Sequence, residues 1–193
     1  MIISHKFRTI FIHVHRTGGT TIENLLSGSD RNAVTHSNQH ANATGSAVKL
    51  LDKHESYFAF GFVRNPWERL LSWYHLLNRG VSENPIDDTT RRIFHNFLTG
   101  LARRSQQDDS FHLNQLDYFT DQTGRLRVDR IGRFENFAED LEGIFRTIGC
   151  EFSDPPIFNV TFPKAYQSYY STEAKDLVAK ACRDDISRFG YRF

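Results

Sequence analysis

The stretch that decides the fold is Phe7–Thr21, with the sequence FRTIFIHVHRTGGTT. Its first part, up to Val14, is rich in the β-branched and aromatic residues typical of a strand. His15–Thr21 then interrupts this run with two glycines, and from Ile22 onward apolar residues return at helical spacing. The pattern predicts a strand, a tight turn and a helix.

The turn His15–Thr21 has the composition of an anion-binding loop. Its glycines let backbone amides approach a ligand, hydroxyl side chains follow, and a helix N-terminus attracts negative charge. Arg16 supplies a countercharge. The leading glycine and the Gly-Lys-Ser/Thr ending of a Walker A loop are absent from this turn, which disfavours an ATP or GTP site. The alternative is an ordinary turn in which Thr20 and Glu23 form a capping box.

A second junction of the same kind follows about 50 residues later. Tyr57–Val63 is almost continuously apolar, as expected for a strand that is covered on both faces. Asn65 and Pro66 then suit the N-cap and first position of a helix. Arg64 therefore ends a strand beside a helix N-terminus, and Ser72 falls on the polar face of that helix. Both side chains suit an anion, although for this junction taken alone solvation at the surface is the favoured explanation.

The remaining pattern alternates strands and helices. We expect a short strand at 33–35, a short helix near 48–51, a helix at 91–101, a loop at 103–110, a strand at 128–134, a helix at 137–148 ended by Gly149, and a last helix at 172–189. Such alternation predicts an α/β fold with a central parallel sheet flanked by helices. Ligands of these sheets bind beyond the carboxyl ends of the strands.

Length and composition narrow the class of protein further. With 193 residues, 39% hydrophobic and 24% charged, the chain is expected to form a single domain over residues 1–193 rather than a disordered tail. The net charge of +1 gives no overall attraction to nucleic acid. Cys150 and Cys182 lack the spacing of metal ligands, and no apolar run is long enough for a membrane span. These features predict a reduced, cytoplasmic protein.

Four segments together resemble one family. FIHVHRTGGTT (11–21) resembles the 5′-phosphosulfate loop, typically FIHIPKTGGTS, of sulfotransferases that use 3′-phosphoadenylyl sulfate (PAPS). FVRNPWERLLSWY (62–74) resembles their 3′-phosphate motif. VDRIGRFENFAEDLEGIF (128–145) and DDISRFGYRF (184–193) resemble the carbohydrate-type branch, which includes the heparan 2-O-sulfotransferases and small bacterial relatives. The resemblance extends over nearly the whole chain.

The resemblance implies a P-loop-like three-layer sandwich and transfer of a sulfuryl group from PAPS to an acceptor hydroxyl, with 3′-phosphoadenosine 5′-phosphate as the product. The acceptor in this branch is a carbohydrate. Arg64 and Ser72 match the residues that bind the 3′-phosphate, and Lys164 matches a loop that closes over the nucleotide. The 5′-phosphosulfate would be bound by Arg16, Thr17, Gly18, Gly19, Thr20 and Thr21. The family's Pro-Lys is His15-Arg16 here, so the catalytic cation would be a guanidinium, which has the charge but not the compact shape of lysine.

The acceptor hydroxyl needs a base, and the resemblance indicates His40. Residues 39–43, QHANA, are similar to the KHATA-like segment that carries the presumed base of the family. A histidine suits this role because its unperturbed pKa is about 6.5. Glu23 is an alternative base, and His40 in a polar loop is alternatively a bystander. The histidines at 13, 15, 36 and 40 lack an acidic or cysteine partner at zinc-ligand spacing, so no metal site is expected.

Two rival functions stay open at this point. A P-loop kinase would need a Walker lysine and a magnesium-binding acid after a strand, and the sequence offers neither. A protein that retains the nucleotide pocket without turnover is the non-enzyme alternative, because Arg16 replaces the family lysine. The Arg pairs 91–92 and 103–104 either favour an anionic sugar or belong to solvated helix faces. Arg133 either borders the nucleotide or pairs with Glu135.

Overall fold

The computed structural model describes residues 1–35, 46–78, 86–107, 112–152 and 166–193. The chain forms two compact units, and each is described by itself. The first comprises Met1–Arg64 with Leu116–Asn159, and the second comprises Asn65–Gln115 with Val160–Phe193. The first unit contains the β-sheet, and the elements described in the second are helices.

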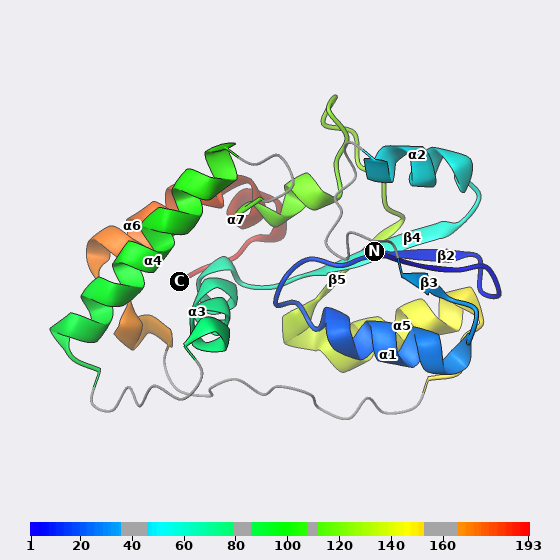
Figure 1. Ribbon diagram of the computed structural model, residues 1–193, viewed down its shortest axis with the longest axis horizontal. Coiled ribbons are helices and arrows are strands. Elements are labelled where there is room, and N and C mark those ends of the chain that lie inside the picture. The colour runs from blue at the N-terminus through cyan, green and yellow to red at the C-terminus, as the bar shows by residue number, and fades with distance from the viewer. Residues whose placement is uncertain (36–45, 79–85, 108–111, 153–165) are drawn as a thin grey trace. The chain divides into compact units, whose positions relative to one another are not determined.

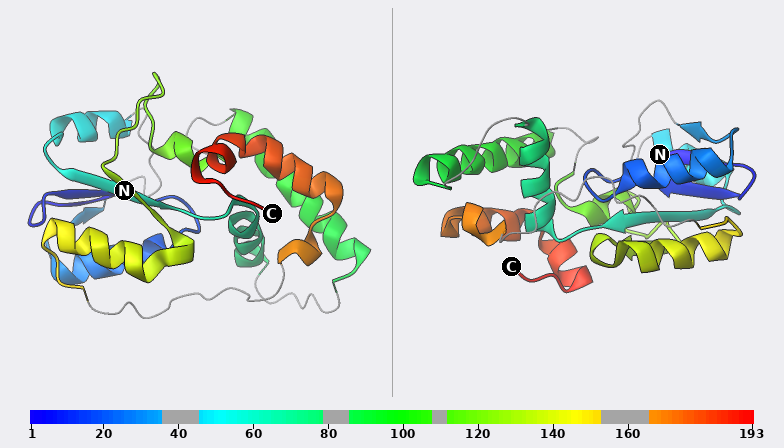
Figure 2. Two further views of the ribbon diagram at one scale, coloured as in Figure 1. Left: turned by 180° about the vertical axis from the view of Figure 1, so that it is seen from behind. Right: turned by 90° about the horizontal axis from the view of Figure 1, so that it is seen from below.

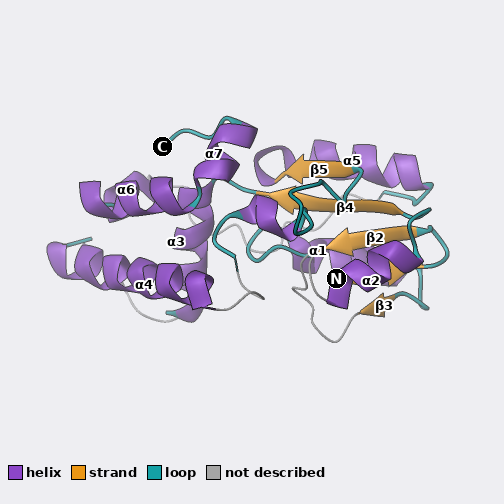
Figure 3. Ribbon diagram, turned by 90° about the horizontal axis from the view of Figure 1, so that it is seen from above, coloured by secondary structure: helices purple, strands orange, loops and turns teal. Residues whose placement is uncertain are grey.

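The first unit is built on a five-stranded mixed sheet in the order β3-β1-β2-β4-β5. The strands are β1 (Ile2–Ser4), β2 (Thr9–Ile12), β3 (Val34–Thr35), β4 (Phe58–Val63) and β5 (Arg130–Arg133). As predicted, β2, β4 and β5 are parallel, and their arrows point the same way in Figure 3. The sequence analysis missed β1, which pairs antiparallel with both β2 and β3, so the sheet is not wholly parallel.

Helices cover both faces of this sheet, which agrees with the predicted α/β class. Helices α1 (Gly19–Ser29) and α5 (Phe137–Ile148) lie side by side on one face, and α2 (Ser46–Lys53) lies on the other (Figures 1 and 2). Two short 3-10 helices are η1 (Gln115–Tyr118) and η2 (Phe134–Asn136). The face toward α1 and α5 contributes Phe11, Phe60 and Phe62, which pack with Ile22, Leu26, Leu141, Ile144 and Phe145. The period-two alternation of the strands therefore places their phenylalanines in one core.

The second unit contains α3 (Pro66–Leu77), α4 (Asp88–Gln107), the 3-10 helix η3 (Tyr166–Tyr169), α6 (Thr172–Ala181) and α7 (Arg183–Phe189). The predicted start of α3 is confirmed: the Asn65 side chain accepts hydrogen bonds from the amides of Trp67 and Glu68, and Pro66 follows the cap. Aromatic rings form the core. The Phe94 ring lies edge-on to Tyr74 and Tyr170, at centroid distances of 5.1 and 4.9 Å.

Two predictions about the second unit were wrong. Residues 103–107 continue α4 instead of forming a loop, because Arg, Ser and Gln without glycine or proline allow a helix to extend. The expected helix at 172–189 is two helices, separated at Cys182, whose φ of −113° and ψ of 29° are not helical.

Buried polar side chains join the second unit's elements. Asp185 is fully buried and accepts hydrogen bonds from both the main-chain and side-chain nitrogens of Gln115, at 2.7 and 2.9 Å. The amide of Asp185 in turn donates to the side chain of Asn114. Arg69 is also fully buried, and its guanidinium donates to the carbonyl of Leu113. These groups fix α3 and α7 to the segment before η1.

A buried carboxylate, that of Asp30, ties the end of α1 to the sheet and yields a stability prediction. It accepts a hydrogen bond of 2.6 Å from the hydroxyl of Ser4, and this bond is the main reason that its pKa lies below the ordinary 3.8. We expect Ser4→Ala to lower the free energy of unfolding by about 1.5–3 kcal/mol at pH 7, the range for hydrogen bonds to charged groups.

The loss of unfolding free energy caused by Ser4→Ala should become smaller as the pH falls. A carboxylate whose folded-state pKa is depressed stabilises the protein above its unfolded-state pKa, and this contribution disappears as the pH falls and the group is protonated. Urea unfolding of the wild type and Ser4→Ala at pH 7 and near pH 3 should therefore give a smaller difference at the acidic pH. Ser27→Ala on the exposed side of α1 serves as the control. An equal difference at both pH values would contradict the role of Asp30.

Candidate anion-binding site

The turn between β2 and α1 has the backbone geometry of an anion cradle. Arg16 and Gly18 have left-handed backbone conformations, with φ of +66° and +85°. Left-handed residues that alternate with ordinary ones direct successive amides toward one side, and such concave sets of N–H groups bind anions. The predicted anion turn therefore has a suitable shape as well as a suitable composition.

Helix α1 begins immediately after this turn, with Gly18 as its N-cap. The amides of Thr21 and Ile22 donate to the carbonyl of Gly18, at 3.1 and 3.3 Å. The amides ahead of them have no acceptor within the helix, as in the first turn of any helix, and they carry its partial positive charge. The alternative of a Thr20–Glu23 capping box is wrong, because no side chain caps α1.

Two glycines allow the turn to pack against its neighbours. A Cβ on Gly18 would come within 2.5 Å of the Phe137 ring, and a Cβ on Gly19 within 2.0 Å of the His13 ring. Both distances are far below van der Waals contact. Any side chain at either position would therefore push α5 or His13 away from the turn.

The threonines of the turn have different roles. The Thr17 hydroxyl is buried and donates to the carbonyl of Val14 at 2.9 Å, so its side chain closes the turn and leaves only its amide for a ligand. Thr21 is buried in the first turn of α1, whereas Thr20 is exposed. Of the predicted hydroxyl ligands, Thr20 is the one that solvent reaches.

Arg64 lies at the same edge of the sheet as this turn. Strand β2 pairs in parallel with β4, with Ile12 opposite Gly61, and β4 pairs with β5, with Val63 opposite Arg133. The residues that follow these three strands therefore share the carboxyl edge (Figure 3), with neighbouring strands about 4.8 Å apart. Arg64, predicted as a solvated or anion-binding residue, is only 8% exposed.

The ring of Phe134 orients Arg64. The guanidinium carbon of Arg64 lies 4.3 Å from the ring centroid, in a cation–π arrangement. A planar guanidinium stacked on a ring keeps its edge available for a forked contact with an oxyanion. Phe134 directly follows β5, and Arg64 directly follows β4. Because these strands pair in parallel with Val63 opposite Arg133, the two residues meet although they are 70 positions apart in the chain.

Other predicted site residues lie elsewhere or outside the description. Ser72 belongs to α3 in the second unit, where it is 3% exposed instead of lying on a solvated polar face. One turn before it on α3, Arg69 is buried as well, whereas Glu68 and His75 on the same face are only partly buried. His40 and Lys164 lie outside the described residues, and their roles stay predictions.

Sequence reasoning missed two aromatic side chains near the turn. One is Phe134, and the other is Tyr118, a fully buried residue whose hydroxyl lies 3.5 Å from Nδ1 of His15. No local pattern connects residues so far apart in the chain.

The main-chain amide of Arg133 donates to the carboxylate of Asp140 at 2.7 Å, which fixes the start of α5 beside this edge.

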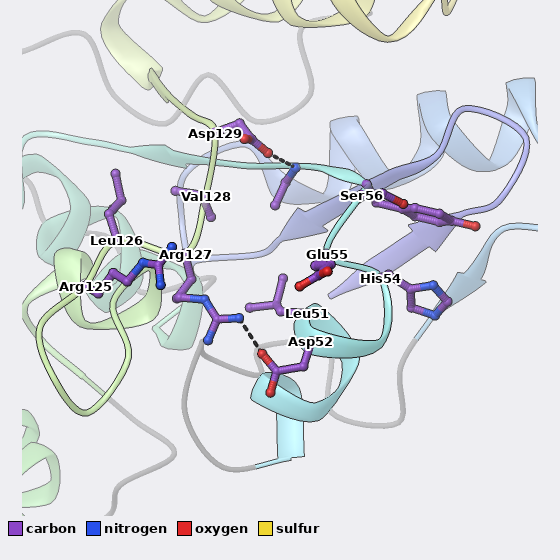
Figure 4. A pocket seen from close by; sticks show the side chains of 12 residues that line it. Leu51, Asp52, His54, Glu55, Ser56, Arg125, Leu126, Arg127, Val128 and Asp129 are labelled. Carbon is purple, nitrogen blue, oxygen red and sulfur yellow. Dashed lines mark hydrogen bonds and ion pairs between the residues drawn. The ribbon is translucent and has the colours of Figure 1, made fainter.

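The opposite end of β4 borders a cavity of about 570 Å³, between α2 and residues 125–129 (Figure 4). Arg127 spans it to an oxygen of Asp52 at 2.6 Å, and Asp129 accepts a 2.7 Å hydrogen bond from the amide of Ala59. Ala59 is at the amino end of β4, whereas Arg64 follows its carboxyl end. The cavity is therefore separate from the anion-binding turn.

The described part of the chain contains neither a cluster of metal-ligating side chains nor a helix suited to span a membrane. Among residues 1–35, 46–78, 86–107, 112–152 and 166–193, no group of three His, Cys, Asp or Glu side chains is placed to hold a metal ion. Within these same ranges, no helix combines the length and the apolar character that crossing a bilayer requires.

Comparison with known proteins gives one match. The model of the sulfotransferase family matches residues 1–191, almost the entire sequence. No curated protein and no solved structure matches the chain.

The geometry of Gly18 leads to a test with a matched control. Gly18→Ala should lower the free energy of unfolding by about 2 kcal/mol or more, because a left-handed conformation is costly for alanine and the new methyl meets Phe137. Gly28→Ala on α1 should instead stabilise by about 0.5–1 kcal/mol, since a Cβ there meets no described atom within 4 Å. Urea unfolding measures both. Equal midpoints for the two variants would contradict the described turn.

Proposed function

The chain belongs to the sulfotransferase family, and from this premise we propose that it transfers a sulfuryl group from PAPS to a hydroxyl of a carbohydrate acceptor. The family supports sulfotransfer in general; the donor and the acceptor are the proposal. One observation carries it: a glycine turn with anion-binding geometry and a ring-stacked arginine follow adjacent parallel strands at one edge of the sheet.

The residues at this edge fit a nucleotide that carries phosphate at two positions. The turn cannot accept side chains at Gly18 and Gly19, which leaves its amides open to a close approach by a sulfate or phosphate group. Arg64, oriented by Phe134, offers a forked donor for a second phosphate. In this proposal residues 16–21 bind the 5′-phosphosulfate and Arg64 binds the 3′-phosphate. The sequence motif adds Ser72 at the 3′-phosphate and Lys164 in the covering loop.

The chemistry needs positioning and charge more than covalent participation by the protein. When PAPS is bound, it supplies an activated sulfuryl group for in-line displacement, for which phosphoryl transfer is the nearest template. The new bond joins the acceptor oxygen to sulfur, and the bond between sulfur and the 5′-phosphate oxygen breaks. Arg16 and the amides at the start of α1 stabilise the charge on the departing phosphate. His40 takes the proton that the acceptor hydroxyl loses.

A carbohydrate acceptor follows from the family branch that the sequence resembles. Within the second unit, Arg91 is held by Asp88 at 2.9 Å and donates to the carbonyl of Ser168 at 3.0 Å. Arg92, Arg103 and Arg104 on α4 are exposed. Arg91 thus has a structural role, and the three exposed arginines are those from which a contact with an anionic sugar is proposed. The cytoplasmic location stays a prediction from the sequence.

Donor binding separates the proposal from the kinase alternative. Isothermal titration calorimetry should show that 3′-phosphoadenosine 5′-phosphate binds more tightly than ATP with magnesium. Arg64→Ala should weaken binding of the bisphosphate by about 10- to 100-fold, as expected for a lost charge-assisted fork. Arg31→Ala, at an exposed arginine beyond the far end of α1, is the control. Tighter binding of ATP, or equal affinities of Arg64→Ala and the wild type, would refute this donor site.

Turnover separates the proposal from the binding-protein alternative. In an assay of labelled sulfate transfer to a saccharide panel, His40→Ala should lower kcat by about 10²- to 10⁴-fold with little change in the nucleotide affinity. His36→Ala tests a neighbouring histidine as the control. Arg16→Ala should lower kcat by about 10²-fold or more, and Arg16→Lys should retain activity because the cation is kept. Nucleotide binding without transfer to any hydroxyl acceptor would favour the alternative.

A further inference from the structure

A buried acid–base pair lies directly beneath the anion-binding turn. Nδ1 of His13, the residue after β2, is 3.1 Å from a carboxylate oxygen of Glu23 on α1. The two side chains are only 6% and 14% exposed. From the sequence, His13 matches a family position and is a candidate for a hydrogen-bonded core residue, and Glu23 is a capping residue or an alternative base; their contact with each other was not predicted.

The His13 ring also contacts the start of α1. Its Cδ2 and Nε2 atoms lie 2.0 Å from the position that a Cβ on Gly19 would occupy, so the ring edge rests on the backbone of the first helical residue. The ring also stacks on Phe11, with a centroid distance of 5.6 Å and an angle of 28°. His13 is thus fixed by contacts with Phe11, Gly19 and Glu23. A change in its position or charge acts on the helix N-terminus.

The charge of Glu23 creates a problem for an anion site. This carboxylate lies in the second turn of the helix whose N-terminus would hold the 5′-phosphosulfate, and like charges at such short range repel each other in a buried setting. Protonation of His13 would neutralise Glu23 locally and add a positive charge beside Gly19. A neutral His13 would leave the negative charge in place.

We propose that His13 is a positioning residue of the donor site and that nucleotide binding favours its protonated form, paired with Glu23. This inference rests on the proposed function, because it requires a nucleotide anion at the start of α1. A bound anion stabilises the imidazolium, so binding is accompanied by uptake of a proton at His13. The imidazolium, held by Glu23, in turn supports the Gly19 backbone against the ligand.

Three charged groups of the described residues bear on the pair. Glu23 faces His13 from α1, and the Met1 α-amino group beside β1 interacts with Glu23; burial lowers the pKa of this amino group to about 6, while Glu23 opposes the decrease. The adjoining strand β4 contributes the apolar Phe60 and Phe62, which share one core with Phe11. Arg16 is the cation of the turn itself. These groups remain present in a His13 variant, so a difference in proton uptake from the wild type reports on the imidazole together with its pairing to Glu23.

Calorimetry in two buffers of different ionisation enthalpy measures the number of protons taken up. We expect the wild type, titrated with 3′-phosphoadenosine 5′-phosphate at pH 7, to take up a substantial fraction of a proton more than His13→Asn. We also expect His13→Asn to bind about tenfold more weakly and to lose the gain in affinity that the wild type shows from pH 8 to pH 6. The phosphates of the ligand titrate identically in every variant, so differences between variants report on the protein.

Two further variants keep the test decisive. Glu23→Gln preserves the shape of the partner and removes its charge, so it should also reduce proton uptake, and it serves if His13→Asn does not fold. His5→Asn changes an exposed histidine that contacts Tyr57, away from the turn, and should behave as the wild type. Equal proton uptake by the wild type, His13→Asn and Glu23→Gln, with nucleotide still bound, would overturn this inference alone. Failure of the wild type to bind the nucleotide would overturn the proposed function and the inference with it.

Discussion

The site depends on the close approach of backbone and rings where β2 passes into α1. Gly18 packs against the Phe137 ring, and Gly19 packs against the His13 ring. A Cβ atom on either glycine would lie within 2.5 Å of the ring, so neither position can carry a side chain. Because the rings belong to α5 and to the end of β2, the turn is held from both sides. A backbone fixed in this way directs its amides without the help of side chains, and this preorganisation is what an oxyanion requires.

Parallel pairing supplies the second part of the site. Strands β2, β4 and β5 run in the same direction, so the residues that follow them meet at one edge although they are separated by 50 to 70 positions in the sequence. The turn, Arg64 and Phe134 therefore belong to one surface of the first unit. Stacking on Phe134 limits the guanidinium of Arg64 to few orientations, which reduces the entropy lost when it binds a phosphate.

Buried charged or titratable side chains at two places attach α1 to the sheet. His13 and Glu23 form an acid–base pair below the turn, and Asp30 at the other end of α1 is held by Ser4. Both arrangements connect α1 to the strands by hydrogen bonds that apolar packing alone would not provide. Helix α1 is thus attached at its start and at its end, so that its N-terminus keeps a fixed position relative to the sheet.

The sequence by itself determined most of the elements and the family. Local patterns predicted the strand–turn–helix unit at residues 7–26, the capped start of α3 and the end of α5 at Gly149, because each depends on neighbouring residues. The motif resemblance predicted the sulfotransferase family, which the family match confirmed. The tertiary structure alone decided the antiparallel β1, the burial of Ser72, the ring on Arg64 and the partner of His13. These features arise from contacts between residues far apart in the chain, and no local periodicity encodes which distant side chain will fill a given space.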